Sequence, residues 1–526
     1  MSAGIASFVI TLLEDISASW ARMLLALVAS ILFSIVVGIL AATSKRLEKI
    51  ILPTLDVLQT IPILGFFPVV IFVIVSALPG FAGINLAVIF LIFTSMAWNI
   101  SFGVYEAVKS IPEEIKELGA LYHFSFLRKV RRLYIPASME RIAYQSSISW
   151  SIGLFYLVTS EIFSTGNQNF AVKYGIGVEI AKIASSGVIA LHYVLTIVFL
   201  IAAVVLTRYL ILNPFSIYAE KFSFKGDVSQ LRKSRVLQFY RLVYGKICSL
   251  LPKYKFNMDL QLRRREHVER RGEKQKPKLR NLDLAVLALS IALFAGFVLL
   301  YGAEGSELVV LASLAVSFIR VWFTYIIAAA IAVPLSIGIG LSKRAFEPSM
   351  ELLQILSSLP APILLPLLVV MLRGTPFFSE EVAITVIFIA MIWYLMYSII
   401  SGIRGIPKSM LEMARISGMK LKDRLRKIYI PAMLPAFVTG SITAIGGAWN
   451  SLIVAEYFSV QSNGSTTILS SVSIGIGKLI DEAVAAGNLE LMVLAIISMT
   501  IMVITINRLF WQRLYNKFTK KYIVSV

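Results

Sequence analysis

"PKSMLEMARISGMKLKDRLRKIYIPAMLP", residues 407–435, lies between two long apolar runs of the chain. It carries seven Lys or Arg residues, a density of charge that the hydrocarbon core of a membrane does not accept. A related stretch, "PEEIKELGALYHFSFLRKVRRLYIPASME", occurs at 112–140, again between apolar runs. A charged segment that recurs in this way predicts a membrane protein built from two copies of one unit.

The overall composition supports a protein that crosses the membrane several times. Of the 526 residues, 58% are hydrophobic and 15% are charged, whereas soluble domains are about half apolar and a quarter charged. We attribute the net charge of +20 to basic loops on the cytoplasmic side of the membrane rather than to a surface that binds nucleic acid. One cysteine and three histidines exclude a disulfide framework and a Cys/His metal cluster. The N-terminus lacks a basic n-region, so no cleaved signal peptide is expected.

Membrane spans are predicted from apolar runs of about 20 residues. Residues 3–13 are too short to cross a membrane, and we expect an interfacial helix there or, alternatively, a twelfth span. About eleven runs are long enough, and they lie at 20–42, 58–78, 84–104, 134–160, 187–212, 282–302, 311–341, 352–372, 383–402, 431–456 and 488–509.

The distribution of Lys and Arg orients these spans. The basic segments, among them those at Lys45, Lys109, Lys343, 407–435 and the C-terminal "RLFWQRLYNKFTKKY", all follow odd-numbered spans. Cytoplasmic loops carry the excess of Lys and Arg. The pattern therefore predicts a cytoplasmic C-terminus and an N-terminus on the opposite side.

The two copies align at nearly constant offsets. Ser19 and Arg22 meet Ser317 and Arg320 at an offset of 298 residues. Further along, the charged loops and Glu161 and Glu456 align at an offset of 295. The predicted units are a first repeat (1–220), a basic cytoplasmic linker (221–280), an extra span (281–303) and a second repeat (304–526). Each repeat holds an odd number of spans, so the extra span makes the repeats parallel.

Each charged loop has the pattern of two short helices joined at a turn. Pro407 suits the first position of a helix, Gly418 interrupts it, and apolar residues then recur on one side of a second helix. These apolar residues are Leu421, Leu425 and Ile428 in the second copy and Phe126, Val130 and Leu133 in the first. Docking on a protein partner and anchoring to anionic lipid headgroups are both compatible with such amphipathic helices.

The second loop resembles the "EAA" loop of binding-protein-dependent ABC importer permeases, whose pattern is E-A-A-x₃-G-x₉-I-x-L-P. Glu412, Ala414 and Gly418 occupy its first positions, and Ile428-x-Ile430-Pro431 its last. The stretch "GGAWNSLIVAEYF", 446–458, is similar to the nitrate, sulfonate, taurine and bicarbonate branch of that family.

This resemblance implies an all-α polytopic fold of two parallel five-helix permease repeats in the plasma (inner) membrane of a prokaryote. It also implies passage of a small solute, an inorganic or organic anion, with two ABC ATPase subunits on the cytoplasmic side and a solute-binding protein outside. In that family the loop is the coupling helix, a role that falls on Glu412, Ala414 and Gly418. A secondary transporter or a channel uncoupled from ATP is the competing interpretation.

The first loop departs from the family pattern. Glu117 and Gly119 match Glu412 and Ala414, but His123 stands where the second loop has Gly418. Glycine at such a corner usually supplies a backbone conformation that histidine adopts less readily. We therefore expect altered docking geometry or weaker coupling in the first half; a metal ligand or pH switch at His123 is an alternative.

No sequence motif supplies catalysis. The chain contains no G-x₄-G-K-[ST] phosphate-binding loop, and the linker is too short and too basic for an ATPase domain. We expect no catalytic site, cofactor, metal or nucleic-acid partner, and ATP hydrolysis on a separate chain.

Polar residues within the spans are candidates for the translocation path, although Ser, Asn and Gln also join helices to one another. Glu161 and Glu456 are distinctive because an acid recurs at the same place in both copies. They are expected to form a gate or an ion pair with Arg22 or Arg320, or to lie at the interface with water. Exchanging the charges of Glu456 and Arg320 should then restore some of the transport that the single variants lose. The other candidates are Gln59, Asn99, Ser147, Gln354, Ser357 and Asn450.

Two further features have open interpretations. The proline pairs Pro62/Pro68 and Pro360/Pro366 are expected to break the second helix of each repeat, either as hinges or as static kinks. The segment 221–280 holds eighteen Lys or Arg against five Asp or Glu. It is interpreted as a tether for the second half, with anionic lipid or nucleic acid as alternative ligands.

Overall fold

The computed structural model describes residues 2–60, 63–164, 172–185, 191–220, 222, 306–357, 359–406, 408–462, 465–511, 513–515 and 517–518. Nearly all of the basic linker, the predicted span 282–302, Pro62 and Pro407 lie outside these residues.

Each half is a succession of helices. The first half consists of α1 (Ser2–Thr43), α2 (Lys45–Thr60), α3 (Ile63–Ala77), α4 (Phe81–Lys109), α5 (Glu113–Leu121), α6 (Phe126–Lys129), η1 (Val130–Tyr134), α7 (Ile135–Ser164), α8 (Ile176–Ser185), α9 (Leu191–Thr207), η3 (Arg208–Leu212) and α10 (Asn213–Glu220). The second half consists of α13 (Ser306–Leu341), α14 (Lys343–Leu356), η5 (Ala361–Leu364), α15 (Leu365–Leu372), α16 (Phe378–Arg404), α17 (Lys408–Ile416), α18 (Leu421–Arg424), η6 (Leu425–Tyr429), α19 (Ile430–Glu456), strands β1 (Tyr457–Ser462) and β2 (Ser465–Ser471), α20 (Ile476–Ala485), α21 (Leu489–Ile506) and η7 (Asn507–Trp511).

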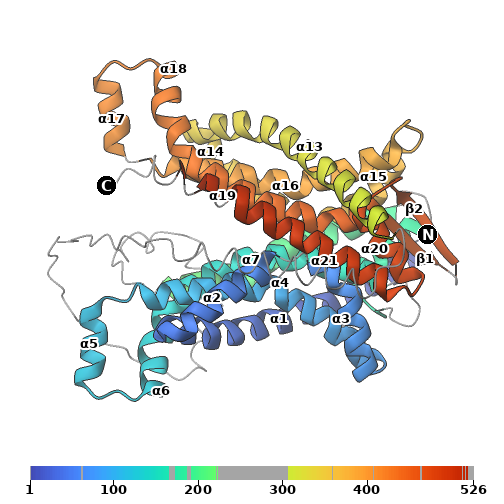
Figure 1. The fold of residues 1–526 in the computed structure, drawn as a ribbon, viewed down its shortest axis with the longest axis horizontal. Coiled ribbons are helices and arrows are strands. Elements are labelled where there is room, and N and C mark those ends of the chain that lie inside the picture. The colour runs from blue at the N-terminus through green and yellow to red at the C-terminus, as the bar shows by residue number, and fades with distance from the viewer. Residues whose placement is uncertain are drawn as a thin grey trace.

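The two halves have the same internal packing. In the first half α4 packs against α1 and α7, and in the second half α16 packs against α13 and α19. Figure 1 shows the halves meeting near α20 and the strands and separating toward the opposite end of the molecule. The helix pairs α5–α6 and α17–α18 both project from that opposite end (Figure 1), as the parallel duplication predicts.

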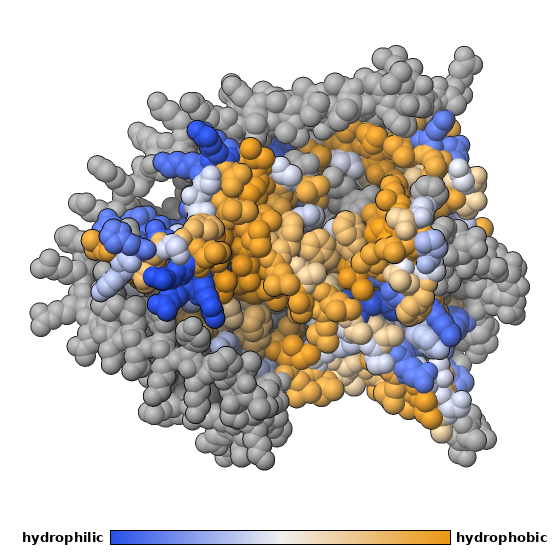
Figure 2. Space-filling view, turned by 90° about the horizontal axis from the view of Figure 1, so that it is seen from below, coloured by the Kyte–Doolittle hydropathy of each residue, from blue (hydrophilic) through white to orange (hydrophobic). Residues whose placement is uncertain are grey.

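The protein is a multi-pass membrane protein. Seven helices of the described residues are long and apolar enough to cross a membrane. Figure 2 shows the corresponding surface, where a broad area of hydrophobic side chains lies between more hydrophilic ends. Such an area suits the hydrocarbon core of a bilayer.

The prediction for residues 3–13 is wrong. They are the first turns of α1, which runs without a break from Ser2 to Thr43. Residues 5–37 contain no Pro or Gly, so the backbone hydrogen bonds of the helix continue through the polar residues between the two apolar runs. Asp15 in this stretch is 1% exposed and faces protein rather than lipid.

The second helix of the second half is broken, as its prolines predict. In the second half Pro360 precedes the 3₁₀ turn η5, and Pro366 is the second residue of α15. A proline at the first positions of a helix loses no hydrogen bond, because its missing N–H has no intrahelical acceptor there. In the first half α2 is described to Thr60 and α3 from Ile63, so the predicted break at Pro62 lies outside the described residues. Pro68 lies inside α3 and does not end it.

The second helix of each charged loop is not a separate element. In the second half, residues 421–456 form one continuous helix, with a π-helical segment, η6, before Pro431. The first half repeats this arrangement with η1 before Pro136. Proline has no N–H to donate to the carbonyl four residues earlier. A π-helical turn accommodates this, because its backbone hydrogen bonds span five residues instead of four.

The two strands were not predicted from the sequence. Strands β1 and β2 form an antiparallel hairpin with an irregularity between Phe458 and Ser459. The hairpin packs on α8 of the first half, so it extends from the second half across to the first.

Candidate functional site

A buried ion pair joins three elements of the first half. The Arg22 guanidinium on α1 lies 2.5 Å from the Glu161 carboxylate on α7, and Glu161 is 0% exposed. The Ser19 hydroxyl, one helical turn before Arg22, donates to Glu161 at 2.8 Å. Arg22 also donates to the carbonyl of Tyr174 at 2.6 Å.

The N-terminus of α8 completes this group. The amide of Gly177 donates to Glu161 Oε2 at 2.9 Å, and the amide of Ile176 donates to the Ser19 hydroxyl at 3.0 Å. The amide nitrogens at the start of a helix have no intrahelical acceptors and carry partial positive charge. A carboxylate buried at this position is therefore satisfied by both an arginine and a helix N-terminus. We call Ser19, Arg22, Glu161 and 175–177 the first brace.

The second half repeats the arrangement residue for residue. Arg320 on α13 pairs with Glu456 at the end of α19. The Ser317 hydroxyl donates to Glu456 at 2.5 Å, and the amide of Gly477 donates to it at 2.7 Å. Arg320 also donates to the carbonyl of Ile474 at 3.1 Å. We call Ser317, Arg320, Glu456 and 475–477 the second brace.

Glycine is required in both braces because the backbone passes close to the carboxylate. A methyl group built on Gly175 would lie 2.6 Å from Glu161 Oε2, and one on Gly475 would lie 2.4 Å from Glu456 Oε2. Real Cβ atoms do not approach other atoms so closely. The repeat Gly-Ile-Gly at 175–177 and 475–477, offset by 300 residues, was the sequence signal that would have revealed this part of the site.

The structure confirms the expected pairing of each glutamate with an arginine. It contradicts the alternative that the glutamates lie at the interface with water, since Glu161 and Glu456 are both 0% exposed. An arginine and carboxylate that are buried, paired and fully hydrogen-bonded fix the relative positions of the elements that carry them.

The braces differ in charge. In the first brace Arg22 Nε donates to the Asn85 carboxamide at 2.7 Å. In the second brace Glu380 stands at the corresponding place, and its two oxygens each accept from Arg320 at 2.7 Å. The second half also holds Asp481 on α20, one of whose buried oxygens has no partner among the described residues. Burial raises the pKa of Asp481 well above its usual range, and the carboxylates of Glu456 and Glu482 raise it further.

A cavity of about 60 Å³ lies between the two halves. Its lining comes from α7 of the first half and from α16, α19 and the segment around η5 of the second half. No charged side chain lines it. The lining residues are Ser151, Ile152, Phe155, Tyr156, Ser357, Leu359, Ala361, Ile389, Ala390, Trp393, Tyr394, Gly447 and Asn450.

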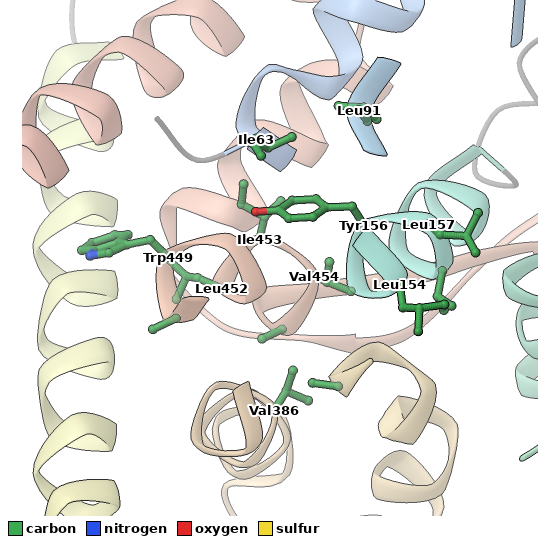
Figure 3. Packing of buried hydrophobic residues seen from close by; sticks show 14 of the residues in the cluster. Ile63, Leu91, Leu154, Tyr156, Leu157, Val386, Trp449, Leu452, Ile453 and Val454 are labelled. Atoms are coloured by element: carbon green, nitrogen blue, oxygen red, sulfur yellow. The ribbon is translucent and has the colours of Figure 1, made fainter. Parts of the chain in front are cut away.

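Two of the predicted path residues line this cavity, Ser357 and Asn450. Asn450 also joins the halves, because its Oδ1 accepts from the amide of Ile63, the first residue of α3, at 2.8 Å. Figure 3 shows the neighbouring packing, with the Tyr156 ring extending from α7 toward α19, where Ile453 lies.

The remaining path candidates are dispersed. The Ser147 hydroxyl donates to the carbonyl of Ala143 in its own helix at 3.1 Å. Gln59 is exposed and Asn99 half-buried, and neither lines the cavity. The side chain of Gln354 lies outside the described residues.

The second charged loop is a compact helical hairpin. Gly418 has φ +64°, and the amide of Met419 donates to the carbonyl of Ala414 at 3.1 Å, which closes the end of α17. This is the pattern in which a left-handed residue ends a helix. Ala414 is 4% exposed and packs with Ile428, so its small side chain lets the two helices approach. Glu412 is exposed.

The first loop keeps the same backbone turn without glycine. His123 has φ +48°, the left-handed conformation that Gly418 adopts. Glu117, on α5 like Gly119, is exposed. The geometry of the turn is thus retained. Its backbone is strained at His123, because residues other than glycine rarely adopt the left-handed conformation.

Both loops expose apolar side chains at the end of the molecule that faces away from the hairpin. These are Leu121, Tyr122, Phe126 and Leu127 in the first loop and Met413, Ile416 and Leu421 in the second. Among the described residues, no group of three or more His, Cys, Asp or Glu side chains is placed to hold a metal ion.

Duplicated helical halves with a shared cavity and matching exposed loops define a membrane-embedded transport permease. The chain belongs to the family described as "Binding-protein-dependent transport system inner membrane component", whose model matches residues 34–213 and again 330–520. The duplication and the resemblance to importer permeases are thereby confirmed.

Similar proteins are permeases as well. Over 209 residues the chain is 29% identical to the nitrate import permease protein NrtB of Leptolyngbya laminosa. The aligned region covers 40% of this chain and 69% of NrtB. Over 181 residues it is 30% identical to the bicarbonate transport system permease protein CmpB of Synechococcus elongatus, and the aligned region covers 34% of this chain and 60% of CmpB. Over 152 residues it is 28% identical to the putative aliphatic sulfonates transport permease protein SsuC of Bacillus subtilis, and the aligned region covers 28% of this chain and 52% of SsuC.

Proposed function

We propose that this chain is the permease subunit of an ATP-driven importer and that its two halves form the translocation path for a small anion. On this proposal two ATPase subunits bind on the cytoplasmic side, one at each charged loop, and a separate solute-binding protein delivers the anion outside. The chain lies in the plasma membrane of a prokaryote with its C-terminus in the cytoplasm. The similarity to nitrate, bicarbonate and sulfonate permeases supports an anion as solute.

The observation that carries the proposal is the pair of matching loops at one end of the molecule (Figure 1). Met413 is 63% exposed and Ile416 is 86% exposed in the second loop, and Leu121 and Leu127 are 74% and 78% exposed in the first. Apolar side chains in loops that carry many cations suit a protein groove better than water, because the apolar contact provides affinity and the charge provides orientation. One such loop in each half suits a partner that is itself a dimer.

The test measures ATPase capture and uptake with one variant and one control. Met413→Asp together with Ile416→Asp places charge on the exposed apolar surface of α17 without touching its buried side. Ile468→Asp, at a 57% exposed apolar position in β2, is the matched control. We expect the native chain and the control to co-purify with an ATPase and to support ATP-dependent uptake in proteoliposomes. The double variant should lose most of the uptake and retain about one ATPase subunit per chain, because the first loop is unchanged.

Two results would contradict the proposal. Capture of no ATPase by the native chain would remove the energy source. Uptake that persists without ATP and follows an imposed ion gradient would assign the chain to the secondary transporters instead.

A further inference from the structure

The cavity between the halves is lined by several groups that can donate hydrogen bonds. Its lining includes the hydroxyls of Tyr156 and Tyr394 and the indole of Trp393. The buried Trp393 Nε1 has no acceptor among the described residues, and neither tyrosine hydroxyl makes a hydrogen bond to another described residue. A buried donor without an acceptor costs about 1–3 kcal/mol, so the Trp393 indole favours a ligand that accepts. The two tyrosine hydroxyls can donate to the same ligand.

Asn450 adds one further donor to the cavity. Its Oδ1 is occupied by the amide of Ile63, and its Nδ2 donates to the carbonyl of Gly446 at 2.9 Å. A carboxamide nitrogen carries two hydrogens and its oxygen two lone pairs, so this side chain retains one free donor, which a bound anion can use, as well as one acceptor position.

The cavity also limits the size and charge of a ligand. A water molecule needs about 10–15 Å³ of such space, so a cavity of about 60 Å³ accommodates roughly four atoms of that size. No Lys or Arg lines it, and an anion bound there would be held by neutral donors alone, which favours passage over tight retention.

We propose that Tyr156, Trp393, Tyr394 and Asn450 form a transit site for a small inorganic oxyanion of about four heavy atoms, such as nitrate or bicarbonate. This inference rests on the proposed function and narrows its solute. An alkyl sulfonate carries the same acceptor oxygens, but its chain exceeds the volume of the cavity. The site is asymmetric, because the position equivalent to Asn450 in the first half is Phe155 and that equivalent to Tyr156 in the second half is Ser451.

The test uses the purified full-length chain in lipid nanodiscs without an ATPase. Tryptophan fluorescence is titrated with sodium nitrate at constant ionic strength, with bicarbonate and ethanesulfonate as competitors. We expect saturable quenching that bicarbonate reverses and ethanesulfonate does not. Tyr156→Phe and Tyr394→Phe each remove one hydroxyl and should weaken nitrate binding about tenfold. Trp393→Phe should abolish the saturable signal.

The matched control is Trp98→Phe, at the position equivalent to Trp393 in the first half. The indole nitrogen of Trp98 is also buried without a described partner, but Trp98 does not line the cavity. It should leave nitrate binding unchanged. Linear, unsaturable quenching that is equal in all variants would overturn the site, and so would equal competition by ethanesulfonate.

The result also separates this inference from the proposed function. Saturable binding in a chain that captures no ATPase would support the transit site and contradict the importer. ATP-dependent uptake that is unchanged in Tyr156→Phe, Trp393→Phe and Tyr394→Phe would support the importer and contradict the site.

Discussion

At the scale of single residues, the braces are the best-defined part of the molecule. Each combines an arginine, a glutamate, a serine and a helix N-terminus, all buried. The sequence predicted the arginine–glutamate pairing because acids and arginines recur within apolar spans, where each needs a partner. It did not predict the role of the Gly-Ile-Gly segments, because their close approach to the carboxylate depends on how three distant elements pack.

The structure gives a physical reason to expect that exchanged charges do not restore transport. In Glu456→Arg with Arg320→Glu, the new arginine would face the amides of Gly477 and its helix N-terminus, which favour an anion. The new glutamate would lie beside Glu380. We therefore expect the double exchange to be as defective as either single variant, measured as folded protein recovered in detergent and as uptake. Recovery of near-native uptake would contradict this account of the brace.

Gly475→Ala tests the close approach of the backbone to Glu456. The added methyl overlaps the carboxylate, so we expect a loss of about 2–4 kcal/mol in the free energy of unfolding. Gly446→Ala, in α19, is the control, because a methyl there meets nothing within 4 Å. It should be neutral or stabilising by about 0.5–1 kcal/mol. Denaturant titration of both variants in nanodiscs measures the difference, and equal stability of the two would contradict the argument.

Asp481 should make the protein less stable as pH rises. A carboxyl whose pKa is higher in the folded than in the unfolded state takes up a proton on folding, so stability falls between the unfolded pKa of about 4 and the folded pKa. Asp481→Asn does not titrate. The gain in melting temperature of this variant over the native chain should therefore be larger at pH 8 than at pH 5. A gain independent of pH would show that Asp481 has no raised pKa.

At the scale of elements, the prolines and glycines explain most of the departures from regular helices. The π-helical segments η1 and η6 precede Pro136 and Pro431, and the break before α15 coincides with Pro360. These positions could be read from the sequence, since proline acts locally. The hairpin β1–β2 could not, because its strands are stabilised by packing on α8 of the other half.

His123→Gly tests the strain in the first loop. Histidine at φ +48° costs about 1 kcal/mol relative to glycine, so the variant should stabilise the turn by about that amount. Gly418→His should cost a similar amount in the second loop. On the proposed function, His123→Gly should leave ATPase binding nearly unchanged, because the turn has the left-handed conformation already in the chain without its partner and the relieved strain is common to both states. Binding titrations with the captured ATPase measure this, and weaker binding would indicate that the imidazole itself contacts the partner.

At the scale of the whole molecule, direct contacts hold the two halves together. The amide of Ile63 donates to Asn450, the Tyr193 hydroxyl donates to the carbonyl of Ile363 at 2.6 Å, and Arg508 pairs with Asp56 at 2.9 Å. One hydrophobic core includes residues of both halves. The sequence predicted the parallel arrangement from span number and charge, but the contacts between the halves depend on tertiary packing that neither repeat specifies alone.

Cutting the chain within 221–280 should therefore leave the halves associated. A protease site inserted in this segment and cleaved in nanodiscs should yield two fragments that co-elute in size-exclusion chromatography. The contacts of the buried core provide the free energy, and the linker contributes only effective concentration. Separate elution of the fragments after solubilisation in mild detergent would mean that the linker is what keeps the halves together.

The central claim is that one chain serves as a whole permease with two coupling loops, and native mass spectrometry of the assembled complex tests it most directly. With a chain of 58.3 kDa, the account predicts one copy of this chain bound to two ATPase subunits. Met413→Asp with Ile416→Asp should shift the main species to one ATPase per chain. A native complex with two copies of this chain for two ATPase subunits would contradict the claim, because each chain would then supply only one functional loop.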